Sequence, residues 1–331
     1  MLNFCTLFDS NYLTRGIAMF KSLQFQCDDF HLYIFAFDDI ACNILKKLNY
    51  VNVTVISLNE FEDEELLSIK STRTKAEYCW TCTPSTILYV INHFKAESCT
   101  YIDSDLYFYS NPKVLFDEMV NNSIMITEHR FTKINDRAKI AGIYCVQFIT
   151  FKNDSNGLEV LNWWRNACNE WCYNRYEDGK FGDQKYLDDW TTRFRGVHVM
   201  NHLGGGLAPW NIQQYKLIEK KENRLFFKTK KENCKFEAIF YHFHYVRYYQ
   251  KGLIDIGWVK IPNKIMKNIY IQYIKEIEDA LTIVKKVDKE FSTILFKFNF
   301  ANHKGLREKV KFIFKIVTRF NLFKKEKLRN K

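Results

Sequence analysis

Runs of apolar and β-branched residues alternate with segments of helical spacing through the first hundred residues. The runs are almost continuously apolar, as is typical of strands that helices cover on both faces, and they lie at 3–8, 31–37 and 51–58. Between them, apolar residues recur every three or four positions at 13–23, 41–48 and 60–69. This order predicts an α/β fold with a parallel sheet, and such sheets bind ligands beyond the carboxyl ends of their strands.

The pattern continues less regularly along the rest of the chain. Proline fits the first turn of a helix, so Pro84 predicts a helix start, and a strand is predicted at 99–103. The other elements predicted are a helix at 158–175 and strands at 124–128, 145–151 and 237–246. From Asn263 the chain is predicted to be helical and basic. We therefore divide it into a domain at 1–260 and a helical, basic C-terminal extension at 261–331.

Two carboxylates interrupt the apolar and aromatic run "TYIDSDLYFY" at 100–109. Residues two apart on a strand point to the same side, so Asp103 and Asp105 would aim at one point if the strand continued through them. Two such charges repel each other, and a shared cation resolves the repulsion. The alternative is a pair of solvated loop carboxylates that cap a helix.

The segment "YIDSD" resembles the Asp-x-Asp motif of glycosyltransferases with the GT-A fold, most closely family 8 and related nucleotide-diphospho-sugar transferases. Three further segments match in the same order: "CTLFDSNYLTRGIAMFKSL" at the start, "KFGDQKYLDDW" at 180–190 and "IFYHFHYV" at 239–246. The resemblance covers residues 1–250. It implies an α/β, Rossmann-like nucleotide-sugar-binding domain with a mixed central sheet.

The resemblance also implies roles for several residues. Asp9 and Asn11 occupy the positions that hold the uridine, and Asp103, Ser104 and Asp105 those that hold the diphosphate with its metal. Oxygen and imidazole ligands fit Mn²⁺ or Mg²⁺ better than zinc, which favours sulfur.

The third metal ligand is expected to be a histidine. We expect His242, which ends an apolar run and is followed by Phe, with His244 and His202 as alternatives. His202 opens "HLGGGLAPW", which matches the spacing of the family motif His-x-x-Gly-x-x-Lys-Pro-Trp. Ala208 stands where that motif has a lysine, which puts a diphosphate contact in doubt.

Two neighbouring residues are expected to face the sugar. By resemblance, Asp183 would bind sugar hydroxyls and Gln184 would lie beside the anomeric carbon, in a family that retains the anomeric configuration. A helix N-cap is the alternative role for Asp183. Arg15, Arg73 and Lys75 are candidate cations for the diphosphate, or else solvated surface charges. The glycines at 204–206 are expected to let backbone approach the acceptor or sugar.

The cysteines and apolar runs indicate the compartment. The ten cysteines include a single Cys-x-x-Cys pair, Cys79 and Cys82, and a zinc site would want a second pair or histidines at ligand spacing. We therefore expect reduced, buried thiols. The opening residues lack the features of a secretion signal, and no apolar run reaches the ~18 residues of a membrane span, so a cytoplasmic protein is expected.

Positive charge is concentrated at the C-terminus. The net charge is +11, but residues 304–331 carry eleven Lys and Arg against two Glu. Within this tail the apolar residues form one stripe: Leu306, Val310, Ile313, Phe314, Val317 and Phe320. We expect a helix lying on an anionic membrane surface, which would make the protein peripheral on the inner face of the cytoplasmic membrane. The alternative is a helix docked on its own catalytic domain, with its cations solvated.

These features together predict a metal-dependent glycosyltransferase. It would move a sugar from a nucleotide-diphosphate donor such as a UDP-sugar to a saccharide or lipid-linked glycan acceptor. One alternative is a non-catalytic sugar-nucleotide or glycan-binding protein with the same fold, which Ala208 in place of a lysine would suit. A nucleic-acid binder driven by the tail is a second alternative, and we do not expect it because the first 303 residues are nearly neutral.

Overall fold

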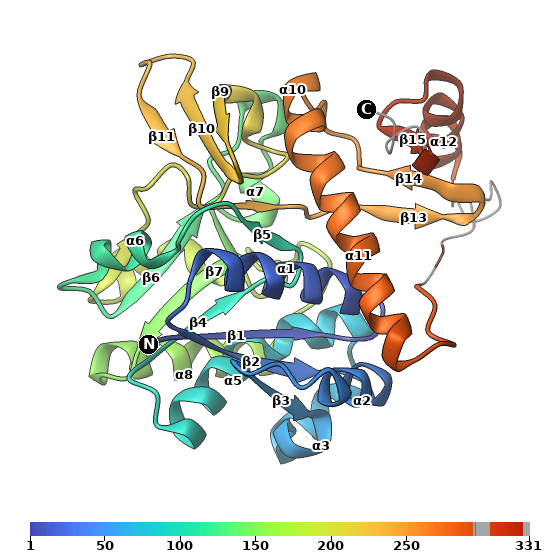
Figure 1. Ribbon diagram of the computed structural model, residues 1–331. Helices are drawn as coiled ribbons and strands as arrows, with labels where there is room; N and C mark the ends of the chain where they lie inside the picture. The colour runs from blue at the N-terminus through green and yellow to red at the C-terminus, as the bar shows by residue number, and fades with distance from the viewer. Residues whose placement is uncertain (294, 296–304, 327–331) are drawn as a thin grey trace.

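A seven-stranded mixed sheet forms the centre of the protein, with the strand order β3-β2-β1-β4-β7-β6-β8 (Figure 1). The computed structural model describes residues 1–293, 295 and 305–326. The strands of the sheet are β1 (Leu2–Phe8), β2 (Phe30–Ala36), β3 (Val53–Ser57), β4 (Ser98–Ile102), β6 (Ile124–Glu128), β7 (Tyr144–Lys152) and β8 (Val197–Val199). β1 to β4 run parallel, whereas β7 is antiparallel to both β4 and β6, so the predicted α/β class with a mixed sheet is confirmed.

Helices cover both faces of this sheet because successive residues of its strands point to opposite sides. Phe4 and Phe8 of β1 belong to a core with α1 (Leu13–Gln26), α2 (Asp39–Leu48) and α11 (Ile271–Val287). Cys5 and Leu7 belong to a second core with α4 (Glu64–Lys70), α5 (Lys75–Phe94) and α8 (Ser155–Glu170). Figure 1 shows α11 crossing over α1 on the near face.

A third core lies beside the main sheet, where β5 meets segments from the second half of the chain. It includes Tyr107, Tyr241, Phe243 and Tyr273, all buried. The strands here are β5 (Leu106–Phe108) paired with β12 (Phe240–His242), the sheet β9 (Tyr215–Lys221), β10 (Arg224–Thr229) and β11 (Lys235–Glu237), and the sheet β13 (Arg247–Tyr249), β14 (Leu253–Asp255) and β15 (Leu322–Lys324).

Short helices connect these elements. They are α3 (Leu58–Phe61), α6 (Lys113–Phe116), α7 (Ala138–Ala141), α9 (Trp190–Arg193), α10 (Asn263–Ile265), the 3₁₀ helices η1 (Asp117–Met119), η2 (Lys133–Asn135), η3 (Lys185–Asp189), η4 (Ile212–Gln214) and η5 (Gln250–Gly252), and the π-helix η6 (Met266–Tyr270). The last helix is α12 (Leu306–Thr318).

The predicted helix start at Pro84 is wrong. α5 begins at Lys75, because Thr74 and Glu77 form a capping box in which each side chain bonds the other's backbone N–H. Pro84 therefore lies inside a helix of 20 residues.

Three other predicted elements are shorter or divided. The segment 60–69 is split into α3 and α4, with Asp63 capping the second by accepting from the N–H of Leu66. α8 ends at Glu170 rather than 175, and of the predicted strand 237–246 only Phe240–His242 pairs as β12.

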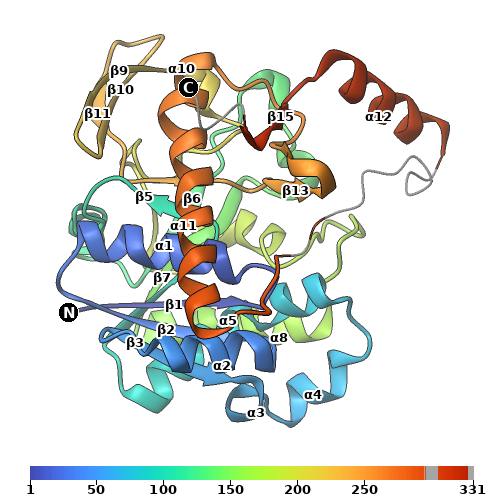
Figure 2. The same cartoon turned by 45° about the vertical axis from the view of Figure 1, so that its right-hand side comes forward.

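The C-terminal helix α12 lies at the edge of the molecule and contacts the rest of the chain there. Figures 1 and 2 show α12 at the outer edge of the molecule, next to the sheet of β13, β14 and β15. Lys315 of α12 is buried and lies 2.5 Å from the Asp255 carboxylate at the end of β14. Lys304 and residues 327–331 of the predicted basic tail lie outside the described residues. Within the described part of the chain, no helix combines the length and apolar character needed to cross a membrane.

The predicted burial of the cysteines holds for eight of the ten. All ten lie in the described residues and none forms a disulfide; eight are buried, Cys79 is half-buried and Cys234 is exposed.

Candidate metal centre

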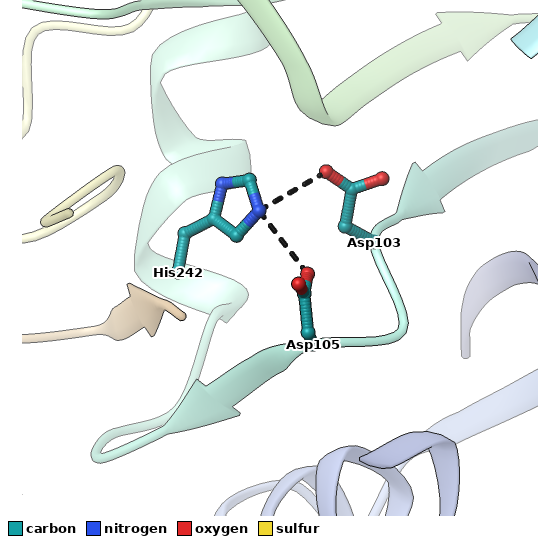
Figure 3. A group of neighbouring side chains, drawn as sticks. All are labelled: Asp103, Asp105 and His242. Carbon is teal, nitrogen blue, oxygen red and sulfur yellow. Dashed lines mark ion pairs between the residues drawn. The ribbon is translucent and has the colours of Figure 1, made fainter. Parts of the chain in front are cut away.

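Asp103 and Asp105 lie in a tight turn between two strands. β4 ends at Ile102 and β5 begins at Leu106, so the strand does not continue through the two aspartates as the period-two argument assumed. The N–H of Leu106 donates to the carbonyl of Asp103 across the turn, at 3.2 Å. The turn still brings the two carboxylates together, at the carboxyl end of β4 (Figure 3).

Strand pairing brings His242 to the same point. β12 runs antiparallel to β5, and His242 is opposite Leu106, the residue that follows Asp105. The Nε2 atom of His242 lies 3.5 Å from an Asp103 carboxylate oxygen and 3.1 Å from an Asp105 oxygen. One ligand atom from each of these residues lies within 4.8 Å of the others, and no other group of three His, Cys, Asp or Glu side chains among the described residues meets this criterion. The expected ligand set is thus assembled with His242 as its histidine.

Solvent reaches one side of this cluster. The Asp103 side chain is 29% exposed and that of Asp105 12%, whereas His242 is 6% exposed. An ion can therefore approach over Asp103 while the histidine remains fixed in the protein interior.

The electrostatics of the cluster keep opposite charges in contact. Burial raises the pKa of the Asp103 carboxyl to about 6, although His242 pulls it down. Burial also raises the pKa of Asp105, but His242, His244 and Arg15 together outweigh it, so that its pKa is lowered. For His242, burial lowers the pKa while Asp105 and Asp103 raise it well above its ordinary value. The two carboxylates thus favour a positive charge at the point where the three side chains meet, which is the charge that a bound cation would supply.

The two alternative histidines are not part of this cluster. His244 lies next to His242 with ring centres 5.9 Å apart, and burial lowers its pKa to about 4. Trp210 packs edge-on against both rings. His202 is elsewhere: its Nδ1 accepts from the N–H of Gly204.

Asp183 lies near the cluster, and Gln184 contacts the last residue of α7. Burial and the charge of Asp103 raise the pKa of the Asp183 carboxyl to about 7. The indole N–H of Trp164 donates to the Asp183 carbonyl, fixing the backbone there. The Gln184 amide donates to the carbonyl of Ala141 at 2.6 Å. η3 begins just afterwards with Gln184, not Asp183, in the N-cap position.

The first strand and helix contribute three of the predicted residues. Asp9 follows β1 and accepts from both the backbone and the side-chain N–H groups of Asn11, at 3.0 and 2.6 Å. Arg15 in α1 donates to the carbonyl of Asn11 and, at 2.6 Å, to that of Val246. Arg15 therefore links the end of β1 to the segment that follows His242, and its charge reaches Asp105.

The other candidate cations are placed differently. Arg73 donates to the hydroxyl of Tyr173 and to the carbonyl of Asn169, so its guanidinium is bound by the last turn of α8 and the loop that follows. Lys75 is the first residue of α5. Ser104 is buried in the turn between the two aspartates. The ligand-binding roles of all these residues remain predictions.

Sequence reasoning missed two residues that contact the cluster. The hydroxyl of Tyr101 donates to an Asp103 oxygen at 3.1 Å. Gln147 of β7 lies with its side-chain Oε1 2.8 Å from Nδ1 of His242. The one visible signal was a single amide inside the apolar run "CVQFITF".

The fold defines the class of protein. The chain aligns with the crystal structure of an active-site mutant of the galactosyltransferase LgtC at a TM-score of 0.51, covering 84% of this chain and 96% of that one at 9% identity. It aligns with the bifunctional glycosyltransferase WbbM at a TM-score of 0.50, covering 86% and 51% of the two chains at 13% identity. The predicted GT-A fold of glycosyltransferases is therefore confirmed.

A sequence relative defines the family more closely. The chain is 31% identical to the uncharacterised protein YfnD of Bacillus subtilis over 299 residues, which are 88% of this chain and 93% of YfnD. The chain belongs to the family of YfnD. No protein-family model matches the sequence.

Proposed function

We propose that the protein is a metal-dependent glycosyltransferase that takes a sugar from a nucleoside-diphosphate donor, a UDP-sugar. The observation that supports this most is the cluster of Asp103, Asp105 and His242 at the carboxyl edge of the parallel strands in a GT-A fold. A ligand in an open α/β sheet binds at this edge. The acceptor we propose is a saccharide or a lipid-linked glycan, and the reaction proceeds with retention.

The residues of the cluster fit a hard divalent cation, Mn²⁺ or Mg²⁺. Carboxylate oxygens suit both ions and an imidazole nitrogen favours Mn²⁺, while the absence of a thiolate among the three donors disfavours zinc. Bound there, the cation would neutralise charge on the departing nucleoside diphosphate. Asp103 and Asp105 would hold it from the turn and His242 from β12. Two unit charges about 4 Å apart repel by roughly 4 kcal/mol at an effective dielectric constant of about 20, so the paired carboxylates favour a cation between them.

The neighbouring residues would bind and orient the donor. Asp9 and Asn11 would contact the uridine, and Arg15 and Arg73 would offset diphosphate charge. Asp183 would accept hydrogen bonds from sugar hydroxyls, and Gln184 would lie beside the anomeric carbon. Since a neutral amide is a weak nucleophile, the acceptor hydroxyl would attack an oxocarbenium-like anomeric carbon from the same face that the leaving phosphate departs, and that phosphate would take the proton of the hydroxyl.

We also propose that residues 304–331 bring the enzyme to an anionic membrane surface on the cytoplasmic side. Support comes from the orientation of α12, which buries Lys315 and leaves Val310, Ile313, Phe314 and Val317 about half exposed or more. A helix that exposes its apolar stripe amid cations is suited to the headgroup layer. A lipid-linked acceptor would be found at that surface.

Release of UDP from UDP-sugars in the presence of Mn²⁺ tests the function. The native protein is expected to release UDP, and a chelator is expected to stop it. Asp105→Asn is expected to lower the rate at least ~100-fold, because several kcal/mol of charge stabilisation are lost. Asp39→Asn, an exposed aspartate in the first turn of α2, is the matched control and should keep full activity.

Two outcomes would contradict the proposal in different ways. Native rates in Asp105→Asn would eliminate the metal role of the turn. If UDP-sugars raise the melting temperature but no UDP appears with any acceptor, the chain is instead a sugar-nucleotide-binding protein with this fold.

A further inference from the structure

We infer that Gln147 is a positioning residue that sets the tautomer and orientation of His242, so that the Nε2 lone pair faces the Asp103 and Asp105 carboxylates. This rests on the proposed metal site and adds a residue that the sequence resemblance does not supply. Gln147 lies in the middle of β7, on a different strand from all three proposed ligands.

The hydrogen bond to the imidazole carries the inference. The side-chain carbonyl oxygen of Gln147 is 2.8 Å from Nδ1 of His242. An amide oxygen only accepts hydrogen bonds, so the proton of the ring must be on Nδ1. Nε2, the atom that faces both carboxylates, is then the nitrogen that would lose its proton and present its lone pair when a cation binds. Metal-binding histidines in general use such a partner to fix the ring.

The same residue also fixes the aspartate side of the cluster. The backbone N–H of Asp103 donates to the Gln147 carbonyl at 3.0 Å, just beyond the last β4–β7 pair. Gln147 therefore joins the turn through its backbone and the histidine through its side chain. A change in its position would move both sides of the cluster together.

The surroundings of Gln147 argue against a purely structural role. Its side chain is completely buried, in a strand where eight of nine residues are buried. The side-chain Nε2 has no hydrogen-bond partner among the described residues. A buried amide with one unsatisfied group stabilises a fold less than an apolar side chain of the same shape would. The hydrogen bond between the Gln147 side-chain oxygen and His242 explains why a glutamine occupies this buried position.

Binding of Mn²⁺, measured from the loss of the free-ion electron paramagnetic resonance signal, tests this role without using turnover. Gln147→Met keeps the volume but removes the acceptor, and we expect the affinity to fall about 10- to 100-fold. Gln147→Glu restores an acceptor oxygen and should recover most of the affinity. Thr150→Val is the matched control, because Thr150 lies on β7 like Gln147 but away from the cluster. The substitution removes a buried hydrogen bond to Thr100 of β4, and the variant should bind Mn²⁺ as tightly as the native chain does.

A second measurement covers the case in which Gln147→Met does not fold. In the Mg²⁺-loaded native protein, ¹⁵N spectra should show the His242 proton on Nδ1. A deprotonated Nδ1 would overturn the inference, as would native Mn²⁺ affinity in a folded Gln147→Met variant. If the native chain binds no divalent ion, the proposed metal dependence itself fails. If the native chain binds Mn²⁺ and the folded Gln147→Met variant binds it equally well, only the role of Gln147 fails, so the two failures are distinguishable.

Discussion

At the scale of single residues, the glycines at 204–206 pack against the protein's own chain. A Cβ on Gly204 would lie 1.8 Å from the carbonyl oxygen of Glu237, and one on Gly205 would lie 2.2 Å from the sulfur of Met200. The N–H of Ile239 donates to the Gly204 carbonyl, and that of His242 to Leu207. The lack of side chains at Gly204 and Gly205 therefore lets two backbone segments pack closely beside β12. This packing holds His242 in place.

Gly204→Ala is expected to destabilise the protein by about 2 kcal/mol or more, because a methyl group has no room beside a backbone carbonyl. Urea unfolding measures this cost. Gly179→Ala is the control, since nothing lies within 4 Å of its Cβ and only its positive φ of 77° is strained. Equal stability of the two variants would show that β12 and its neighbour can move apart freely.

The residues in and around the cluster differ in how readily the sequence predicts them. Two aspartates in an apolar run are conspicuous because burying charge is costly, and a histidine after a short apolar strand follows the same logic. Gln147 is less conspicuous in the sequence, because its role depends on the pairing of β4 with β7 and of β5 with β12. Such long-range pairings leave no local signature in the chain.

At the scale of helices and strands, periodicity predicted the elements of the first half well, since β1, β2 and β4 are largely buried and therefore almost continuously apolar. The start of α5 was predicted wrongly because two local sequence signals compete. Proline favours a first turn, but "TKAE" at 74–77 is a capping box, and the box determines where the helix begins. The strand at 237–246 was overestimated because Phe243 and Val246 pack in the third core outside any strand.

The exposed stripe of α12 gives a prediction for membrane binding. The native chain should float with vesicles containing phosphatidylglycerol and much less with phosphatidylcholine alone. Replacing Val310, Ile313 and Val317 together by Ser should weaken binding at least ~10-fold, since each apolar side chain gains about 1.5 kcal/mol or more on burial.

The control for this experiment is Val51→Ser, which changes a valine that is 91% exposed beside β3. It should bind vesicles as the native chain does. Equal binding by the triple variant, or no preference for anionic lipid, would contradict a membrane role for α12. The ion pair of Lys315 with Asp255 would then serve only to dock the helix.

At the scale of the whole molecule, the candidate site joins the two halves of the chain. The parallel strands supply the turn with Asp103 and Asp105, and the irregular second half supplies His242 through β12. The GT-A class of the fold is confirmed, whereas the donor and the acceptor depend on side chains that the fold alone does not specify.

The central claim is that the turn and β12 hold a divalent cation together with a nucleoside diphosphate. Anomalous scattering from crystals soaked with Mn²⁺ and UDP tests this most directly. We predict a single strong peak at about 2.0–2.3 Å from oxygens of Asp103 and Asp105 and from Nε2 of His242. A structure with UDP bound and manganese absent from these three side chains would contradict the account.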